Sequence, residues 1–277
     1  GEQLIAGTRI LMRAIGVTTA VIGVEANKPD AVKHLCGIIG SATDIKVQML
    51  KTQYPQGGEK QLIAAVTGRE VPAPPALPID VGAVVCNAST AVAVYEAVQK
   101  NKPLIERVVT VTGAAVAQPK NLLTRFGTPV EALIAKCGGL NEGDVKVING
   151  GPMMGRAVSN LESTTSKRTS GLLIMPDRLS KRAPMENCIR CGKCVDACPM
   201  ALEPYLLYSL TEHEMWDRLE QEQIMDCIEC GSCSYECPAK RQLAQSIRAT
   251  KKIEAGKKAA AAAAAAKAKA ELDKLVR

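Results

Sequence analysis

The stretch Cys188-x2-Cys191-x2-Cys194-x3-Cys198-Pro199 recurs with the same spacing as Cys227-x2-Cys230-x2-Cys233-x3-Cys237-Pro238. This spacing is typical of chains with two cubane iron-sulfur clusters, in which the fourth cysteine of each run binds the other cluster. We therefore predict an electron-transfer domain with two [4Fe-4S] clusters. The first cluster would be bound by Cys188, Cys191, Cys194 and Cys237, and the second by Cys227, Cys230, Cys233 and Cys198.

Zinc is the alternative metal, because paired C-x2-C units also build zinc ribbons. A tetrahedral zinc site would leave the third regularly spaced cysteine and the proline after each run unexplained. A disulfide framework is disfavoured, because it is typical of small secreted chains without a large core. The cysteine pattern therefore favours iron-sulfur clusters in a reducing compartment. The remaining thiols, Cys36, Cys86 and Cys137, are expected to be core residues, and His34 and His213 to be ordinary surface or satisfied histidines.

The composition is typical of a folded protein and argues against a nucleic-acid-binding or membrane-spanning chain. With 277 residues, 47% hydrophobic and 23% charged, the chain is long and apolar enough to fold into one large or two to three small domains. Its seven aromatic residues are too few for base-stacking platforms, so nucleic acid is not an expected partner. No apolar run reaches the roughly 18 residues that span a bilayer. The net charge of +7 is unevenly spread, with eight Lys or Arg and three acidic residues in 251–277.

The residues around the cysteine runs indicate helices. Leu202, Leu206, Leu210 and Trp216 recur at helical spacing between the two runs, which predicts a helical cluster domain over residues 186–250. Residues 251–277 are rich in Ala and Lys and include eight consecutive alanines. Alanine has the highest helix propensity, but this stretch has no apolar stripe, so a solvated helical tail is expected.

Residues 1–104 alternate between helix-like and strand-like patterns. Helices are predicted over 4–15, 29–39, 59–66 and 89–100, and strands over 19–24, 45–49 and 81–86. This order predicts an α/β domain with a mostly parallel sheet.

Residues 105–165 instead show short strands, at 108–112 and 114–117, with one helix at 130–136. A small mixed β domain is therefore predicted. The polar stretch 159–170 then marks a boundary, so residues 166–185 are predicted to be a linker.

Several further segments resemble one known family. In chain order they are 23-GVEANKPDA-31, 54-YPQGGEKQL-62, 67-TGREVP-72, 107-RVVTVTG-113, 127-GTPV-130 and 150-GGPMMG-155. Together with the doubled cysteine run, they resemble the C subunit of the Rnf ion-translocating ferredoxin:NAD oxidoreductase complex. The match covers about residues 1–250. The resemblance implies that residues 1–104 are part of an FMN- and NADH-binding domain similar to the flavoprotein subunit of respiratory complex I. It also implies that residues 105–165 form an SLBB domain of the β-grasp type, and that residues 186–250 form a helical ferredoxin-like domain.

The resemblance also implies cofactor-binding residues. Tyr54, Gly57, Gly58 and Glu59 correspond to the loop beside flavin and nicotinamide, and residues 85–90 to the flavin segment. In that segment Val85, Asn87 and Thr90 are the expected contacts. Adjacent glycines let the backbone approach a flat ring or phosphate, and ligands of α/β sheets bind beyond strand ends. The glycine-rich flavin and dinucleotide loop that precedes these elements in the family is not in this sequence. Either the chain is part of a longer protein or its flavin site is incomplete.

The implied function is electron transfer between NAD(H), FMN and the two clusters, in an oxidoreductase and translocase. The implied partners are the other subunits of the complex, including an iron-sulfur subunit and integral membrane subunits. The chain would then lie peripherally on the cytoplasmic face of the inner membrane. Two alternatives remain open: a soluble flavin and iron-sulfur dehydrogenase subunit, and a ferredoxin-like relay that binds no nicotinamide. None of the residues is an obvious acid, base or nucleophile.

Overall fold

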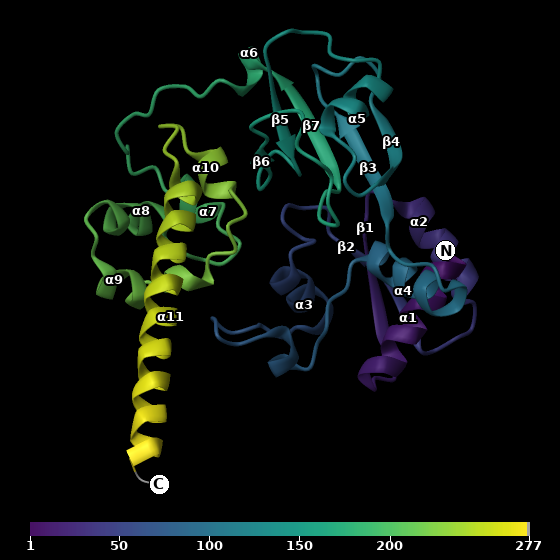
Figure 1. Cartoon of the computed structure of the whole chain (residues 1–277), viewed down its shortest axis with the longest axis horizontal. Coiled ribbons are helices and arrows are strands. Elements are labelled where there is room, and N and C mark those ends of the chain that lie inside the picture. Colours follow the sequence, from purple (N-terminus) through teal and green to yellow (C-terminus); the bar gives the residue numbers. More distant parts are fainter. Residues whose placement is uncertain (276–277) are drawn as a thin grey trace. The chain divides into compact units, whose positions relative to one another are not determined.

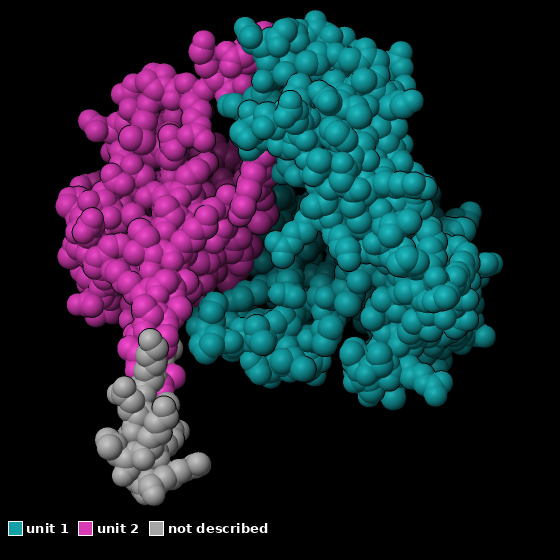
Figure 2. Space-filling model, viewed as in Figure 1, with its two compact units in different colours: residues 1–150, 157–176 teal, residues 151–156, 177–277 magenta. Residues whose placement is uncertain are grey.

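The computed structural model describes residues 1–275 and has two compact units (Figure 2). Unit 1 comprises residues 1–150 and 157–176, and unit 2 comprises residues 151–156 and 177–277. Residues 276 and 277, which end the predicted tail, lie outside the described residues. Among the helices described, none is long and apolar enough to cross a membrane.

Unit 1 begins with the predicted α/β order. It contains α1 (Glu2–Ile15), β1 (Ala20–Glu25), α2 (Pro29–Ile39), β2 (Ile45–Leu50) and α3 (Glu59–Thr67) (Figure 1). The two strands pair in parallel, as expected when a helix connects them. Ile5, Leu35 and Ile45 are buried in one core, which holds α1 and α2 on the strands.

The prediction of a third strand at residues 81–86 is wrong. Here the chain forms a short 3-10 helix, η1 (Pro78–Val81), and then runs on without strand structure to α4 (Ala88–Lys100). A hydrophobic run becomes a strand only where a neighbouring strand completes its hydrogen bonds. Val84 is exposed, which shows that this run is not enclosed in a sheet.

Helices α1 and α4 pack closely because a glycine lies at their contact. Gly7 of α1 is buried, and a Cβ atom placed on it would lie 1.9 Å from the carbonyl oxygen of Ala91 in α4. Ala91 is itself buried and lies close to the first residue of α4. The contact therefore positions the beginning of α4, where two predicted flavin contacts, Asn87 and Thr90, are found.

Residues 106–176 form a five-stranded mixed sheet with one helix. Its strands are β3 (Glu106–Thr112), β4 (Lys120–Arg125), β5 (Val145–Asn149), β6 (Arg156–Ala157) and β7 (Gly171–Pro176), in the order β4-β3-β7-β5-β6. β3 pairs antiparallel with β4 and parallel with β7, and β5 pairs antiparallel with β7. Helix α5 (Val130–Lys136) contributes Leu133 to a core with Val109 and Ile174. The predicted mixed β domain is thus present.

Two local predictions in this region differ from the structure. Residues 114–117 form a turn with a single bridge from Val116 to Leu140 rather than a strand. Residues 171–176, which fall in the predicted linker 166–185, form β7 at the centre of the sheet. The polar stretch 159–170 is therefore not the end of the domain, because the fully buried Leu172 and Ile174 after it complete the sheet core.

Unit 2 is helical, as predicted. It contains α6 (Asp177–Ser180), α7 (Lys193–Asp196), α8 (Pro204–Glu212), α9 (Trp216–Gln221), the 3-10 helix η2 (Ile224–Asp226), α10 (Ser232–Glu236) and α11 (Leu243–Leu275) (Figure 1). The predicted tail is not separate from this domain, because α11 runs unbroken through residue 251. Its first turns are buried through Leu243, Ile247 and Thr250, and they pack on α8.

Among the three isolated cysteines, only Cys137 is buried as predicted. Cys36 is exposed, because α2 buries the neighbouring Leu35 and turns Cys36 away from the two-stranded sheet. Cys86 is exposed because its segment does not enter a sheet. Both histidines are on the surface, as expected.

We predict that Gly7→Ala destabilises the first part of unit 1 by about 2–3 kcal/mol, because the new methyl group forces α1 and α4 apart. Gly37→Ala is the matched control, since Gly37 lies in α2 and a methyl group added there would meet no other atom within 4 Å. This control should be neutral or stabilising by up to about 1 kcal/mol. Amide hydrogen exchange in α1 and α4 is the measurement. Equal exchange rates in the two variants would contradict the prediction.

Candidate functional site

The two cysteine runs adopt the same backbone conformation. In each run, the residue before the second cysteine has a positive φ, 54° at Arg190 and 58° at Glu229. The glycine after that cysteine also has a positive φ and precedes a short helix, with Gly192 before α7 and Gly231 before α10. α7 and α10 contact each other, so the sequence repeat is also a structural repeat.

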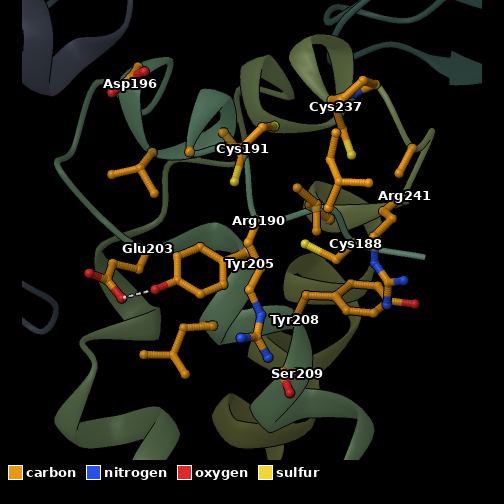
Figure 3. Close-up of a pocket in the computed structure, with 18 of the residues that line it drawn as sticks. Cys188, Arg190, Cys191, Asp196, Glu203, Tyr205, Tyr208, Ser209, Cys237 and Arg241 are labelled. Carbon is orange, nitrogen blue, oxygen red and sulfur yellow. Dashed lines mark hydrogen bonds between the residues drawn. The ribbon is translucent and has the colours of Figure 1, made fainter. Parts of the chain in front are cut away.

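One cavity of about 1010 Å³ is lined by Cys188, Cys191, Cys194 and Cys237. Figure 3 labels three of them, Cys188, Cys191 and Cys237. These are the four cysteines predicted for the first cluster. Polar and charged side chains share the cavity wall, among them Arg190, Glu203, Tyr205 and Arg241. The Tyr205 hydroxyl donates a hydrogen bond of 3.0 Å to Glu203. We call this space the first cavity.

A second, much narrower cavity is lined by Cys198, Cys227, Cys230 and Cys233. These are the four cysteines predicted for the second cluster. The other side chains of its wall are apolar: Pro199, Met200, Leu202, Pro204, Leu207, Ile228, Ala244 and Ile247. In both cavities, three cysteines come from one run and the fourth from the other. The structure thus groups the thiols in the two predicted sets, while their role as ligands stays a prediction.

The two sets differ in their exposure. Each has two buried cysteines, but the other two are exposed in the first set, Cys188 and Cys191, and half-buried in the second, Cys198 and Cys227. The second run is also covered by unit 2's own segment 151–156, since a Cβ atom on Gly231 would lie 2.8 Å from the carbonyl oxygen of Met153. The first run has no such close contact at Gly192. The second set is therefore the more enclosed of the two.

Burial makes three of these thiols, Cys194, Cys227 and Cys233, weaker acids than a free cysteine. It raises the pKa of Cys233 to about 12 and also raises the pKa of Cys194. Burial likewise raises the pKa of Cys227, against the opposing effects of the Glu229 amide and the charge of Lys251. Because iron binds the thiolate, metal binding must displace these protons.

Backbone N–H groups already donate hydrogen bonds to sulfur atoms of the second set. The N–H groups of Leu202 and Glu229 donate to Sγ of Cys198 and Cys227, each at 3.4 Å. The Cys230 thiol in turn donates to the hydroxyl oxygen of Ser232 at 3.4 Å. Hydrogen bonds to sulfur are among the factors that set cluster potentials.

A group of charged residues beside the second cavity was not predicted from the sequence. Glu229 lies 2.7 Å from Arg248 and 3.6 Å from Lys251, both on α11. Lys251 also donates a hydrogen bond of 2.5 Å to the carbonyl oxygen of Cys227. The sequence gives only a weak signal for this charged group. Arg248 and Lys251 have an i,i+3 spacing that is common in helices, and Lys251 belongs to the Ala- and Lys-rich stretch that was predicted to be a solvated tail.

The first group of predicted flavin residues lies on one turn before α3. Tyr54 is exposed, Gly58 is the N-cap of α3, and Glu59 is the first residue of that helix. The N–H of Gly58 donates to the carbonyl oxygen of Pro55 at 2.8 Å, which closes the turn and leaves Gly57 exposed. The turn follows the carboxyl end of β2, the location where α/β sheets bind ligands.

The second group lies at the beginning of α4. Asn87 is the N-cap, and its side-chain oxygen accepts a hydrogen bond of 2.9 Å from the N–H of Ser89. Thr90 is exposed in the first turn of α4, and Val85 is half-buried before it. The two groups thus lie at the N-terminal ends of two helices, where backbone N–H groups favour anions such as phosphate.

Comparison with known families gives three matches in the predicted order. The Nuo51 FMN-binding domain matches residues 1–96, the SLBB domain residues 108–157, and the 4Fe-4S dicluster domain residues 184–241. These matches confirm the predicted fold classes and the predicted FMN and iron-sulfur cofactors. The dicluster match covers both cysteine runs.

The chain is also similar in sequence to C subunits of ion-translocating complexes. The C subunit of the Na⁺-translocating ferredoxin:NAD⁺ oxidoreductase complex of Acetobacterium woodii is 46% identical over 251 residues, which is 91% of this chain and 56% of that protein. The C subunit of the proton-translocating complex of Clostridium ljungdahlii is 46% identical over 251 residues, 90% of this chain and 54% of that protein. The C subunit of the ion-translocating oxidoreductase complex of Rhodobacter capsulatus is 41% identical over 207 residues, 74% of this chain and 40% of that protein. The chain spans about half the length of these curated relatives.

We predict that Gly231→Ala reduces the iron bound per chain more than Gly192→Ala does. Both glycines have positive φ values, 87° and 77°, so both substitutions strain the backbone. Only the methyl group at position 231 would also collide with the backbone of Met153. Iron and acid-labile sulfide are to be measured after anaerobic purification. An equal loss in both variants would show that segment 151–156 does not constrain the second run.

Proposed function

We propose that this chain, which resembles the C subunits of ion-translocating ferredoxin:NAD oxidoreductase complexes over most of its length, is the electron-transfer subunit of such a complex. The observation that carries the proposal is the joint presence of an FMN-binding domain and two crossed four-cysteine sets in one chain. FMN exchanges a hydride with NAD(H) and single electrons with iron-sulfur clusters, and the protein supplies position and electrostatics.

The cysteine sets fit two [4Fe-4S] clusters better than they fit zinc. A zinc ion would draw its sulfur ligands together, since each lies about 2.3 Å from the metal. In the part of the chain that the structure describes, no three His, Cys, Asp or Glu side chains converge on a position suited to one ion. The four thiols around the first cavity instead surround a space of about 1010 Å³, and the second set has the same crossed arrangement of four thiols. We infer that each set binds one cluster.

The turns before α3 and α4 are the proposed binding sites for FMN and NAD(H). Gly57 and Gly58 would let backbone approach a flat ring, and the exposed Tyr54 and Glu59 are available for nicotinamide. Asn87 and Thr90 would contact the flavin from α4, with Val85 packing beside them. Asn87 is also the N-cap of α4, because its side-chain oxygen accepts a hydrogen bond from the N–H of Ser89.

The proposed partners are the other subunits of the complex, including an iron-sulfur subunit and integral membrane subunits. Because these subunits would hold the chain at the membrane, we place it peripherally on the cytoplasmic face. The alternatives are a soluble dehydrogenase subunit and an electron relay without nicotinamide binding. Flavin content separates the relay from the other two functions, and co-purification with membrane subunits separates the proposed function from the soluble dehydrogenase.

The two-cluster assignment predicts about eight irons and eight acid-labile sulfides per chain, with little zinc. Metal analysis of the anaerobically purified chain measures this. Stoichiometric zinc in place of iron would exclude the assignment. This measurement tests the proposed cluster content of the chain and does not depend on partner subunits.

The crossed sets predict which cluster a single substitution damages. Cys198→Ala should impair the cluster of Cys227, Cys230 and Cys233, although Cys198 follows the first run in sequence, because its thiol lines the second cavity. Electron paramagnetic resonance (EPR) of the reduced protein should therefore lose one signal and keep the other. The same signal should be altered by Cys230→Ser. Alteration of different signals by the two variants would reject the crossed assignment.

Asn87→Asp tests the flavin contact without removing the helix cap. Aspartate caps helices about as well as asparagine, so α4 should stay folded. The new carboxylate replaces an N–H donor and adds negative charge, so the FMN bound per protein should fall severalfold. Asn101→Asp makes the same change at the other end of α4 and should leave flavin content unchanged. Normal flavin content in Asn87→Asp would remove Asn87 from the proposed site.

A further inference from the structure

We propose that Lys251 raises the reduction potential of the cluster held by Cys198, Cys227, Cys230 and Cys233. This inference rests on the proposed cluster assignment and goes beyond it, because it assigns an electrostatic role to a residue outside the cysteine motifs. It also gives a redox function to the beginning of α11.

The position of Lys251 is set by helix α11 and by two contacts of its ammonium group. Residue 251 lies two turns into α11, where Ile247 and Thr250 are buried in the helical core. The ammonium group reaches Cys227, the first cysteine of the second run, and donates to its carbonyl oxygen at 2.5 Å. It also lies 3.6 Å from Glu229, which Arg248 contacts from the same helix. Lys251 is therefore held beside the second cavity rather than extended into solvent.

Solvent screens the charge of Lys251 only weakly at this position. Its side chain is only 15% exposed, and the wall of the adjacent cavity is apolar. Charges in such surroundings interact more strongly than charges in water. Each electron that enters a cluster adds one negative charge. A fixed cation beside the cluster therefore favours the reduced form and raises the reduction potential.

The charges around Lys251 allow a test in both directions. Glu229 contributes a negative charge beside the same cysteines, and Arg248 partly balances it. Removal of the Lys251 charge should lower the potential, whereas removal of the Glu229 charge should raise it. A purely structural role for either residue would not produce opposite shifts.

The experiment is an EPR-monitored redox titration of the anaerobically purified chain, with the signals assigned by the Cys198→Ala and Cys230→Ser variants. Lys251→Met should shift the midpoint potential of the second cluster downward and leave that of the first unchanged. Lys251→Arg retains the charge and should remain close to the unsubstituted protein. Glu229→Gln should shift the same midpoint upward.

Lys252→Met is the matched control, because Lys252 is the next residue of α11 and is exposed. It should leave both midpoints unchanged at about 0.15 M salt, where charges in solvent are screened over about 8 Å. Unchanged midpoints in Lys251→Met, or shifts of the same sign in Lys251→Met and Glu229→Gln, would overturn the inference while the clusters remain. Absence of two clusters from the unsubstituted protein would instead overturn the proposed cofactor content.

Discussion

The exchange of one cysteine between the two runs is the constraint on which unit 2 depends. Each four-cysteine set takes its last thiol from the other run, so neither set can form until both runs are folded together. Contact between α7 and α10 meets this requirement, and Cys194, Cys233 and Cys237 share one core with Leu243 of α11. The intervening helices α8 and α9 bury Leu207 and Leu219 in a second core. The hydrophobic packing of unit 2 thus serves to place eight thiols.

The two sets have the same backbone but different surroundings. The first opens to solvent through Cys188 and Cys191 and has charged residues in its wall, whereas the second is apolar and enclosed. Cluster potentials depend on hydrogen bonds, solvent exposure and nearby charge, so the same ligand set can serve two electronic roles. Segment 151–156 and the cation of Lys251 contribute to this difference at the second set alone.

The first part of unit 1 differs from unit 2, because its predicted binding residues lie on exposed turns beside a small parallel sheet. The turn with Gly57 and Gly58 follows β2, and the Asn87 cap begins α4. The close contact of Gly7 with Ala91 positions the beginning of α4, so a residue far from the predicted flavin loop in sequence determines where Asn87 lies. A larger side chain at position 7 would therefore act on the proposed flavin site through α4.

Local spacing in the sequence was sufficient to predict the cysteine sets and several helices. The cysteine runs predicted two crossed sets because three thiols at i, i+3 and i+6 can surround one cluster, and helical periodicity predicted α1, α2, α5 and α8. Features that depend on distant partners became visible only in the folded chain. Residues 81–86 have an apolar pattern but no sheet partner, and residues 171–176 follow a polar stretch but enter the centre of a sheet. Lys251 belongs by composition to a solvated tail, yet the packing of α11 places it against Cys227. Strand pairing and the burial of a charge are determined by neighbours that lie far away in sequence, and local residue patterns do not encode those neighbours.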